Sequence, residues 1–303
     1  MGRSYGAIEA GGTKFVCAVG SSPDDLLIER FDTTTPEKTI PNAVQFLREQ
    51  NAKAKLHAIG IGSFGPIDLD TRSDSYGYIT TTPKPGWSHT DFVGAVRDEF
   101  SIPIGFDTDV NAAALGEHYW GEARGLSDFL YLTIGTGIGG GGMVNGKLMH
   151  GLVHPEMGHI FLPLHPEDRY EGKCPFHDNR CFEGLASGPA VEERWGRPAT
   201  DLNATHDAWT MEAHYISLAL VNYICTVSPQ RIIIGGGVME QKQLFPLIHE
   251  KVSTMLHDYI QSPAIIDNID GYIVPAGLGK RAGVLGALAL AIHASGMTPD
   301  PPA

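Results

Sequence analysis

A run of glycine residues behind an apolar segment narrows the choice of fold more than any other part of this sequence. Residues 129–134 are apolar enough for a buried strand, and Gly135, Gly137 and Gly140 follow with the spacing G-x-G-x-x-G. That spacing is the dinucleotide fingerprint, but the fingerprint requires a helix directly after the loop. Here two short apolar runs surround Asn145-Gly146 instead, which is the strongest short signal for a hairpin. The loop is therefore predicted to join two strands, and the Rossmann interpretation is excluded.

The N-terminal residues repeat this arrangement. Residues 5–10 and 13–19 are predicted strands, and Gly11-Gly12 makes the tight turn between them. Backbone N–H groups and the Thr13 hydroxyl at the tip would form a concavity that binds an anion. The alternative is an ordinary hairpin whose glycines serve only the turn. A third glycine cluster, Gly235-Gly236-Gly237, follows a buried strand and suits close approach of the backbone to a nucleobase or ribose.

Two strand–glycine–strand units, one in each half of the chain, predict an α/β protein of the two-domain actin-like (ribonuclease H-like) ATPase fold, with a cleft between the domains. A smaller domain is expected from residues 1–109 and about 281–296, and a larger one from residues 110–280, including a long loop at 154–185. The further strands and the helices are predicted from apolar spacing, turn residues and caps. The strands are expected at 27–32, 56–61, 104–107, 231–234 and 273–276, and the helices at 36–50, 91–100, 110–120, 211–225, 243–259 and 280–294.

Candidate site residues stand where two predicted strands end. Asp109 lies between a strand and a helix, so it is either the N-cap of that helix or a catalytic carboxylate held rigidly at the cleft. Gly65 and Pro66 follow the strand predicted at 56–61, at a strand end where α/β proteins place ligands, although a plain connection is equally consistent. Asn111 and Glu117, on the helix after Asp109, are expected to be structural or peripheral.

A cluster of histidine and cysteine residues lies in the long loop. His159, Cys174, His177 and Cys181 include the spacing C-x2-H-x3-C and match a closed four-ligand zinc site. A loop without regular structure between 160 and 183 needs such a brace. Structural zinc is favoured over catalytic zinc, because four protein ligands leave no position for water. Scattered surface histidines with two free thiols are the alternative.

Composition excludes several classes of function. A net charge of −13 argues against nucleic acid as a partner, because phosphate-backbone binding needs clustered basic residues. The N-terminus lacks the apolar core of a signal peptide, and residues 282–293 are too short an apolar run to span a bilayer. A cytoplasmic protein that does not bind membranes is expected. Cys17 and Cys225 lie in apolar surroundings and are expected in the core.

With these motifs in view, the chain resembles the ROK family of sugar kinases and sugar-sensing repressors, and most closely the bacterial fructokinases of that family. The resemblance covers nearly the whole length, and its motifs are specific only jointly. The matching stretches are Glu9-Ala-Gly-Gly-Thr-Lys14, Thr108-Asp-Val-Asn-Ala-Ala113, Ile134 to Gly142, Glu156-Met-Gly-His159, the cysteine-containing loop, Cys181-Phe-Glu-Gly-Leu-Ala-Ser-Gly188 and Ile234-Gly-Gly-Gly237.

The resemblance implies transfer of the ATP γ-phosphoryl group to a hexose, most closely to the 6-hydroxyl of D-fructose, with Mg²⁺ as cofactor, structural Zn²⁺ and a homodimeric assembly. Asp109 is implied as general base, and Glu9 as a candidate Mg²⁺ ligand. The implied nucleotide contacts are Gly11, Gly12, Thr13, Lys14, Gly135, Thr136, Gly137, Gly235, Gly236 and Gly237. The implied hexose contacts are Gly65, Pro66, Thr108, Asp109, Glu156, His159 and Glu183.

This sequence departs from the family pattern at three positions. Glu9 stands where many members carry Asp, and Thr108 stands where the glucokinase branch has Asn. His177 replaces the middle cysteine of the usual zinc loop, one position later. Mannose, glucose or an N-acetylated amino sugar therefore remain alternative substrates. A non-catalytic sugar sensor is the alternative of another class, although a repressor needs a DNA-binding domain ahead of the first strand, which starts within the first ten residues.

Overall fold

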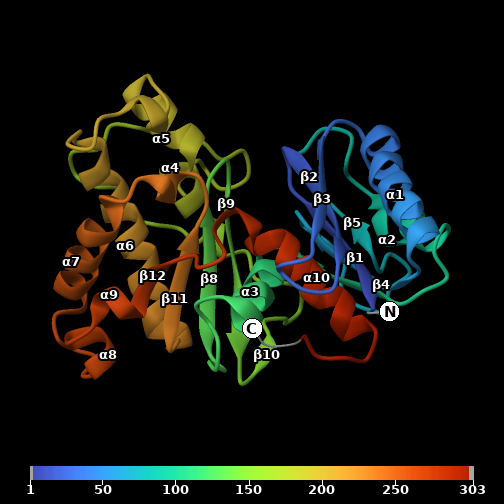
Figure 1. Cartoon of the computed structure of the whole chain (residues 1–303). Helices are drawn as coiled ribbons and strands as arrows, with labels where there is room; N and C mark the ends of the chain where they lie inside the picture. Colours follow the sequence, from blue (N-terminus) through green and yellow to red (C-terminus); the bar gives the residue numbers. More distant parts are fainter. Residues whose placement is uncertain (1–2, 300–303) are drawn as a thin grey trace. The chain divides into compact units, whose positions relative to one another are not determined.

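The computed structural model describes residues 3–299 and contains two five-stranded sheets with equivalent strand order (Figure 1). The first sheet has the order β3-β2-β1-β4-β7 and the second β10-β9-β8-β11-β12. In each sheet, the first strand of an antiparallel hairpin (β1–β2 or β8–β9) has a parallel neighbour on its other side, and that neighbour has a further parallel strand beside it. This repetition confirms the predicted α/β actin-like fold.

The strands of the first sheet are β1 (Ser4–Ala10), β2 (Lys14–Gly20), β3 (Leu27–Asp32), β4 (Leu56–Ser63) and β7 (Ile104–Thr108). Those of the second are β8 (Phe129–Ile134), β9 (Ile138–Val144), β10 (Lys147–Leu148), β11 (Arg231–Gly235) and β12 (Ile273–Pro275). A short separate pair is formed by β5 (Tyr78–Ile79) and β6 (Thr90–Asp91).

The α-helices are α1 (Pro36–Lys53), α2 (Phe92–Arg97), α3 (Asp109–Trp120), α4 (Phe182–Ala186), α5 (Gly188–Trp195), α6 (Ala208–Val227), α7 (Leu244–Leu256), α8 (Pro263–Ile266), α9 (Ile269–Tyr272) and α10 (Ala282–Ala294). The predicted helices are confirmed, with shifted ends. The helix expected at 91–100 is shorter: it ends at Arg97, and it starts at Phe92 because the Asp91 side chain caps it by accepting from Gly94 N–H.

The chain divides into two compact units. Unit 1 comprises Met1–Gly125, Leu148–Pro155 and Lys280–Ala303, and unit 2 comprises Leu126–Lys147 and Glu156–Gly279. The sequence-based division places residues 110–120 in the second domain, whereas α3 groups with unit 1. The reason is its packing on α10, where the backbones approach so closely that a Cβ on Gly286 would lie 1.7 Å from the Ala112 carbonyl oxygen.

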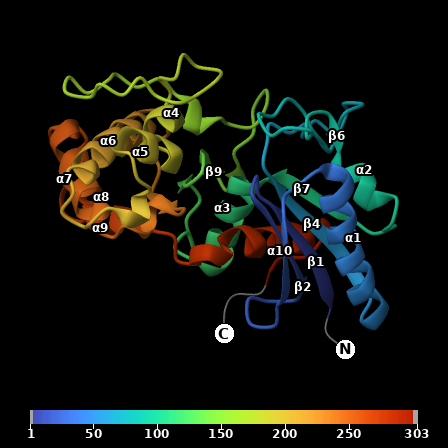
Figure 2. The same cartoon turned by 90° about the horizontal axis from the view of Figure 1, so that it is seen from above.

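The sheet of unit 1 is covered by helices on both faces (Figure 2). One face packs on α1, where Ile8 and Leu47 are fully buried in the main core of the unit. The other face packs on α10, and a Cβ on Gly60 of β4 would lie 1.9 Å from the Ala287 carbonyl oxygen. Because β-strand side chains alternate between faces, Glu9 projects to the α10 side of β1, where a Cβ on Gly283 would lie 2.3 Å from its Oε1.

In unit 2, residues 160–181 form no helix within the described chain, and α4 begins at Phe182, inside the segment 160–183 that was predicted to lack regular structure. The loop is held at Asp168, whose side chain is buried and pairs with Arg194 of α5 at 3.1 Å. The Tyr215 hydroxyl of α6 donates to the same carboxylate at 2.6 Å. Cys17 is buried as expected, but the prediction for Cys225 is wrong, because it lies on the exposed face of α6. Among residues 3–299, no helix has the length and apolar character needed to cross a membrane.

Candidate functional site

The turn between β1 and β2 is held in shape by a residue that the sequence did not single out. Gly11 N–H donates to the Lys14 carbonyl at 3.0 Å across the turn. Thr33, just after β3, donates from its hydroxyl to the Gly11 carbonyl at 2.7 Å and from its N–H to the Thr13 carbonyl at 2.9 Å. Gly12, Thr13 and Lys14 are exposed at the tip. These hydrogen bonds from Thr33 fix the backbone of the turn and leave its tip exposed.

Two carboxylates of unit 1 influence each other at the ends of neighbouring elements. Glu9 pairs in register with Gly62 of β4, and the Asp109 Cα lies 3.5 Å from where a Gly62 Cβ would stand. Burial raises the pKa of Glu9 to about 7, and the negative charge of Asp109 adds to the shift. Burial also raises the pKa of Asp109 to about 6. The Glu9 Oε2 is buried without a hydrogen-bond partner among the described residues.

The N-cap of α3 is Thr108 rather than Asp109. The Thr108 hydroxyl accepts from Asn111 N–H at 3.1 Å, so the interpretation of Asp109 as the cap is wrong. Asp109 is the first helical residue, and its Oδ1 accepts from Val110 N–H at 2.9 Å. Because the cap is supplied by its neighbour, the second carboxylate oxygen of Asp109 is not needed for the helix.

Asp107, at the end of β7, organises a buried network beside Asp109. Its Oδ1 accepts from Thr108 N–H at 2.8 Å and from the Asn111 side chain at 3.0 Å, and its Oδ2 lies 2.8 Å from His150 Nε2. This contact with Asp107 raises the pKa of His150. Asn111 also donates to the Met149 carbonyl at 3.1 Å, so it has the structural role expected. Sequence reasoning missed His150, because its partner lies 43 residues away.

Gly65 and Pro66 lie in a loop after β4 and are joined by a cis peptide bond. The next residue, Ile67, donates its backbone N–H to the Nε2 atom of His154 at 3.1 Å. His154 was not identified from the sequence either, and no local signal marks it, since 87 residues separate the two partners.

In unit 2, the glycine loop between β8 and β9 contacts two other segments. The hairpin is antiparallel as predicted, and the Gly135 carbonyl accepts from Gly188 N–H at 2.7 Å. The Glu183 Oε2 accepts from Ile138 N–H at 2.8 Å, and a Cβ on Gly137 would lie 2.7 Å from the same oxygen. Thr136 is exposed at the tip. Glu183 therefore lies against the backbone of the glycine loop.

The third glycine cluster approaches the first strand of this sheet. Gly236 has a φ of 96°, and a Cβ there would lie 2.3 Å from the Ile134 carbonyl oxygen. Gly235 is the last residue of β11, and the Gly237 N–H lies 3.6 Å from where a Gly135 Cβ would stand. The two glycine loops that were predicted separately are thus neighbours in unit 2.

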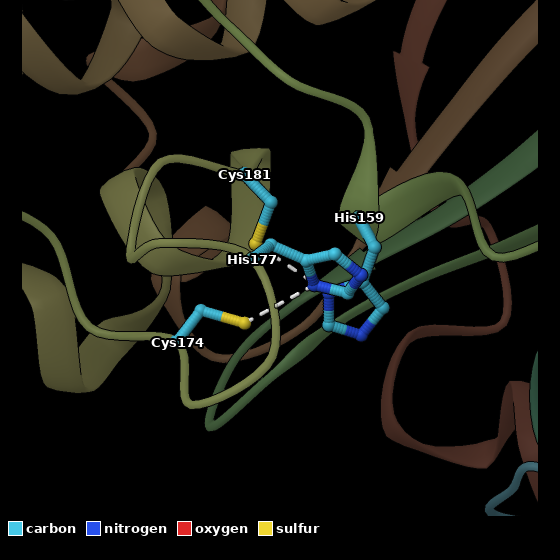
Figure 3. A group of neighbouring side chains, drawn as sticks. All are labelled: His159, Cys174, His177 and Cys181. Carbon is cyan, nitrogen blue, oxygen red and sulfur yellow. Dashed lines mark hydrogen bonds between the residues drawn. The ribbon is translucent and has the colours of Figure 1, made fainter.

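The four predicted metal ligands come together in the long loop (Figure 3). The ligand atoms of His159, Cys174, His177 and Cys181 all lie within 4.8 Å of one another. His159 Nδ1 is 3.4 Å from Cys181 Sγ, and His177 Nδ1 is 3.3 Å from Cys174 Sγ. Tetrahedral zinc with sulfur at about 2.3 Å and nitrogen at about 2.0 Å requires ligand atoms roughly 3.3–3.8 Å apart. The donor set and these two separations fit zinc.

The cluster connects directly to Glu183 and Glu156. Cys181 Sγ accepts from Gly184 N–H at 3.4 Å and so caps α4, whose second residue is Glu183. Burial, with the neighbouring Cys174, raises the pKa of Cys181 to about 12. The charge of Glu183 acts on the His159 ring. The backbone N–H of His159 donates to the Glu156 carbonyl at 3.0 Å. The predicted site residues thus form two sets, one in each unit.

Comparison with known proteins agrees with this geometry. The chain matches the ROK family over residues 5–294. It is 53% identical over 291 residues to a provisionally named fructokinase of Bacillus subtilis (strain 168), covering 95% of each chain. It is 44% identical over 288 residues to the fructokinase of Pediococcus pentosaceus, covering 94% of this chain and 96% of the relative. Among solved structures, the ROK hexokinase of Thermus thermophilus superposes with a TM-score of 0.75 at 25% identity, covering 95% of this chain and 97% of the other. With a match across nearly its entire length, this chain belongs to the ROK family.

Proposed function

We propose that this protein is a hexose kinase that transfers the γ-phosphoryl group of ATP to the 6-hydroxyl of D-fructose. The observation that carries the proposal is near full-length similarity to relatives named fructokinase, at 44% identity to that of Pediococcus pentosaceus and 43% to that of Streptococcus mutans. A bond forms between the sugar O6 and the γ-phosphorus, the bond from that phosphorus to the β–γ bridging oxygen breaks, and ADP leaves.

Asp109 is proposed as the general base that accepts the proton of the attacking hydroxyl. A base works best when its pKa lies near the operating pH, and burial raises the pKa of Asp109 to about 6. It therefore stays ionised at neutral pH yet binds a proton more readily than an ordinary aspartate. Thr108 caps the helix in its place, which leaves the carboxylate available.

The two glycine hairpins are proposed to hold the phosphates of ATP. In unit 1 the contacts would come from Gly11, Gly12, Thr13 and Lys14, whose turn is braced by Thr33. In unit 2 they would come from Gly135, Thr136 and Gly137, with Gly235, Gly236 and Gly237 against the nucleoside. Phosphoryl transfer depends mainly on positioning and charge stabilisation, which backbone N–H groups and hydroxyls supply.

The hexose hydroxyls are proposed to bind Gly65, Pro66, Thr108 and Asp109 of unit 1 and Glu156, His159 and Glu183 of unit 2. His159 turns its Nδ1 towards Cys181, so its Nε2 is left for a hydroxyl. Glu183 has one oxygen occupied by Ile138 N–H, and the other can accept from the sugar.

Zinc is proposed at His159, Cys174, His177 and Cys181, where it would have a structural role. The four protein ligands complete a tetrahedral sphere, so the ion would hold the loop and the start of α4 rather than activate water. Its chemistry there is to keep the thiols as thiolates.

Glu9 is proposed as a Mg²⁺ ligand in the nucleotide complex. Its unpartnered Oε2 and the neighbouring charge of Asp109 fit a hard cation, which prefers oxygen ligands. Mg²⁺ bound with ATP supplies neutralisation of phosphate charge. Gly283 leaves the room that the Glu9 side chain occupies.

The test of this proposal is ADP release measured with fructose, glucose, mannose and N-acetylated amino sugars as acceptors. Fructose is expected to give the highest kcat/KM, and coupling to phosphoglucose isomerase and glucose-6-phosphate dehydrogenase should identify the product as the 6-phosphate. Failure of every hexose to stimulate ADP release would overturn the proposal.

The role of Asp109 is tested by Asp109→Asn, which keeps the acceptor for Val110 N–H but removes the basic oxygen. Turnover is expected to fall by ~10²–10⁴-fold while calorimetry still detects fructose binding. Asp70→Asn, at an exposed ion pair with Arg72, is the control and should leave turnover unchanged. Near-normal turnover of Asp109→Asn would exclude it as the base.

A further inference from the structure

Residues 148–155 leave unit 2 and return to it, yet they group with unit 1. Their flanking segments end at Lys147 and resume at Glu156, both in unit 2. Side-chain contacts hold the intervening residues to unit 1. His150 pairs with Asp107, and His154 binds the backbone of Ile67. The second contact reaches the loop that carries Gly65 and Pro66.

The ring of His154 has hydrogen-bond partners in two backbone segments. Its Nε2 accepts from Ile67 N–H at 3.1 Å, and the Pro155 carbonyl is a hydrogen-bond partner of the ring. The side chain is buried, with 6% of its surface exposed, and Ile67 is 3% exposed. An N–H donor at Nε2 requires that this nitrogen carry no proton, so the neutral Nδ1–H tautomer is bound.

His154 also packs directly against Gly65. A Cβ on this glycine would lie 3.3 Å from the His154 Cε1 and 3.4 Å from its Nε2. The same ring therefore contacts Gly65 and accepts a hydrogen bond from Ile67, the residue after Pro66. It also bonds to the backbone of Pro155, which immediately precedes Glu156. Gly65, Pro66 and Glu156, which belong to these segments, are three of the residues assigned to the hexose in the proposed function.

We propose that His154 is a positioning residue for the hexose, which fixes the Gly65–Pro66 loop and the backbone leading to Glu156 through its neutral ring. This inference rests on the proposed function, since it names what holds the hexose contacts in place. His154 touches neither reacting atom in this scheme, so it acts on sugar affinity rather than on the phosphoryl-transfer step.

Protonation of His154 would break the contact, because an imidazolium has no acceptor nitrogen. Burial lowers the pKa of His154 below its ordinary value. Two charged groups face it: Asp107 at the end of β7 favours the protonated ring, and His150 of the same segment opposes it. Since the folded-state pKa is lowered, the contact is complete at neutral pH and is lost as the pH falls below the ordinary histidine range.

The experiment compares His154→Leu, which removes the acceptor, with His154→Gln, whose Oε1 can accept from Ile67 N–H. For His154→Leu the fructose KM at pH 8 should rise roughly tenfold to hundredfold, because a buried N–H loses its acceptor, while the ATP KM stays constant. His154→Gln should stay within about threefold of the unmodified protein, since it restores the acceptor. As the pH falls below the ordinary histidine range, the fructose KM of the unmodified protein should rise more than that of His154→Gln, which shares the titration of Asp109 but has no histidine at position 154.

His293→Gln is the matched control. His293 is also a histidine of unit 1 with a lowered pKa, but it is exposed and bonds to the Tyr119 hydroxyl at 2.6 Å, away from the sugar loop. Its fructose KM and the pH dependence of that KM should equal those of the unmodified protein. Nitrogen-15 NMR of the full chain provides a readout that does not need activity, with His154 expected as the Nδ1–H tautomer at pH 8.

Several outcomes would overturn the inference. These are an unchanged fructose KM in His154→Leu, equal impairment of both variants, or a protonated Nε2 on His154 at pH 8. If His154→Leu does not fold, the pH profile of His154→Gln and the tautomer decide the matter. Absence of turnover with every hexose in the unmodified protein would instead overturn the proposed function, so the two failures are distinguishable.

Discussion

At the scale of single residues, Glu9 carries an electrostatic penalty that bears on the proposed site. Its pKa is raised to about 7 by burial and by Asp109, so the folded protein binds this proton more tightly than the unfolded chain does. Between about pH 4.5 and pH 7 the native state holds more protons, and stability therefore decreases as the pH rises through this window. Below it the carboxyl is neutral in both states and the penalty is absent.

Glu9→Gln should therefore stabilise the protein without ligands at pH 8 and have little effect at pH 4. The gain is at most about 3 kcal/mol, from 1.36 kcal/mol per pKa unit. Urea unfolding at the two pH values measures it. Glu49→Gln on α1, where the glutamate is exposed, is the control and should show no such pH dependence. An equal effect of Glu9→Gln at both pH values would contradict the assignment of the penalty to its charge.

The sequence predicted residues whose partners are close in the chain better than those whose partners are distant. The four metal ligands lie within 23 residues, and the structure brings them together as expected. Asp107 and His150, or Ile67 and His154, are joined only by the packing of β7 and β4 beside the segment at 148–155. A lone histidine has no local pattern that separates such a role from an ordinary surface position.

At the scale of elements, the metal cluster determines where α4 begins. Cys181 caps α4 through Gly184, and Glu183 lies one residue into the helix. Cys174→Ser should lower the bound zinc from about one ion per chain, reduce the melting temperature and raise the fructose KM. Metal analysis, thermal unfolding and steady-state kinetics are the measurements.

Cys225→Ser is the control for this prediction, because Cys225 is a free, exposed thiol on α6. It should keep the zinc and the melting temperature of the unmodified protein. Zinc-free protein prepared without chelators, with normal stability and activity, would refute the metal assignment.

The glycine cluster after β11 contains two adjacent positions at which the effect of alanine on stability should differ. Gly236→Ala should destabilise the protein by about 1–3 kcal/mol, because φ is positive and the new Cβ would meet the Ile134 carbonyl. Gly237→Ala should leave stability nearly unchanged, since a Cβ there meets nothing within 4 Å among the described residues. Thermal unfolding of the two variants checks this, and similar melting temperatures would contradict it.

Elements were predicted more reliably than their ends. Apolar periodicity gave the strands and long helices, whereas the ends depend on individual hydrogen bonds. Thr35 stands at the N-cap position of α1, yet its side chain makes no capping hydrogen bond in the described structure, while Thr108 caps α3 in place of Asp109. Several residues of each helix start satisfy the same propensities, so tertiary contacts decide among them.

At the scale of the whole molecule, the repeated glycine hairpins predicted the two equivalent sheets, but not how the chain is shared between the units. That division depends on α10, which packs against β4 through Gly60 and against α3 through Gly286. Contacts between residues about 175 apart, such as those of Ala112 with Gly286, leave no mark on local sequence patterns.

A chain ending at residue 279 should therefore fail in unit 1 although all of unit 2 is present. Removal of α10 exposes the face of the first sheet that it covers, so we expect loss of soluble protein and strong binding of a hydrophobic dye. A chain ending at residue 299 keeps α10 and is the control. Normal solubility and a normal melting temperature for the shorter chain would contradict this account.

The position of α10 also affects synthesis. On the ribosome, the first 125 residues emerge early, but α10, the helix that completes their core, is synthesised only after every residue of unit 2. Unit 2, whose residues end at Gly279, can be assembled before that moment. The part of the protein that is made first is thus the last to become native, and until then its uncovered strands depend on chaperones or on speed to avoid aggregation.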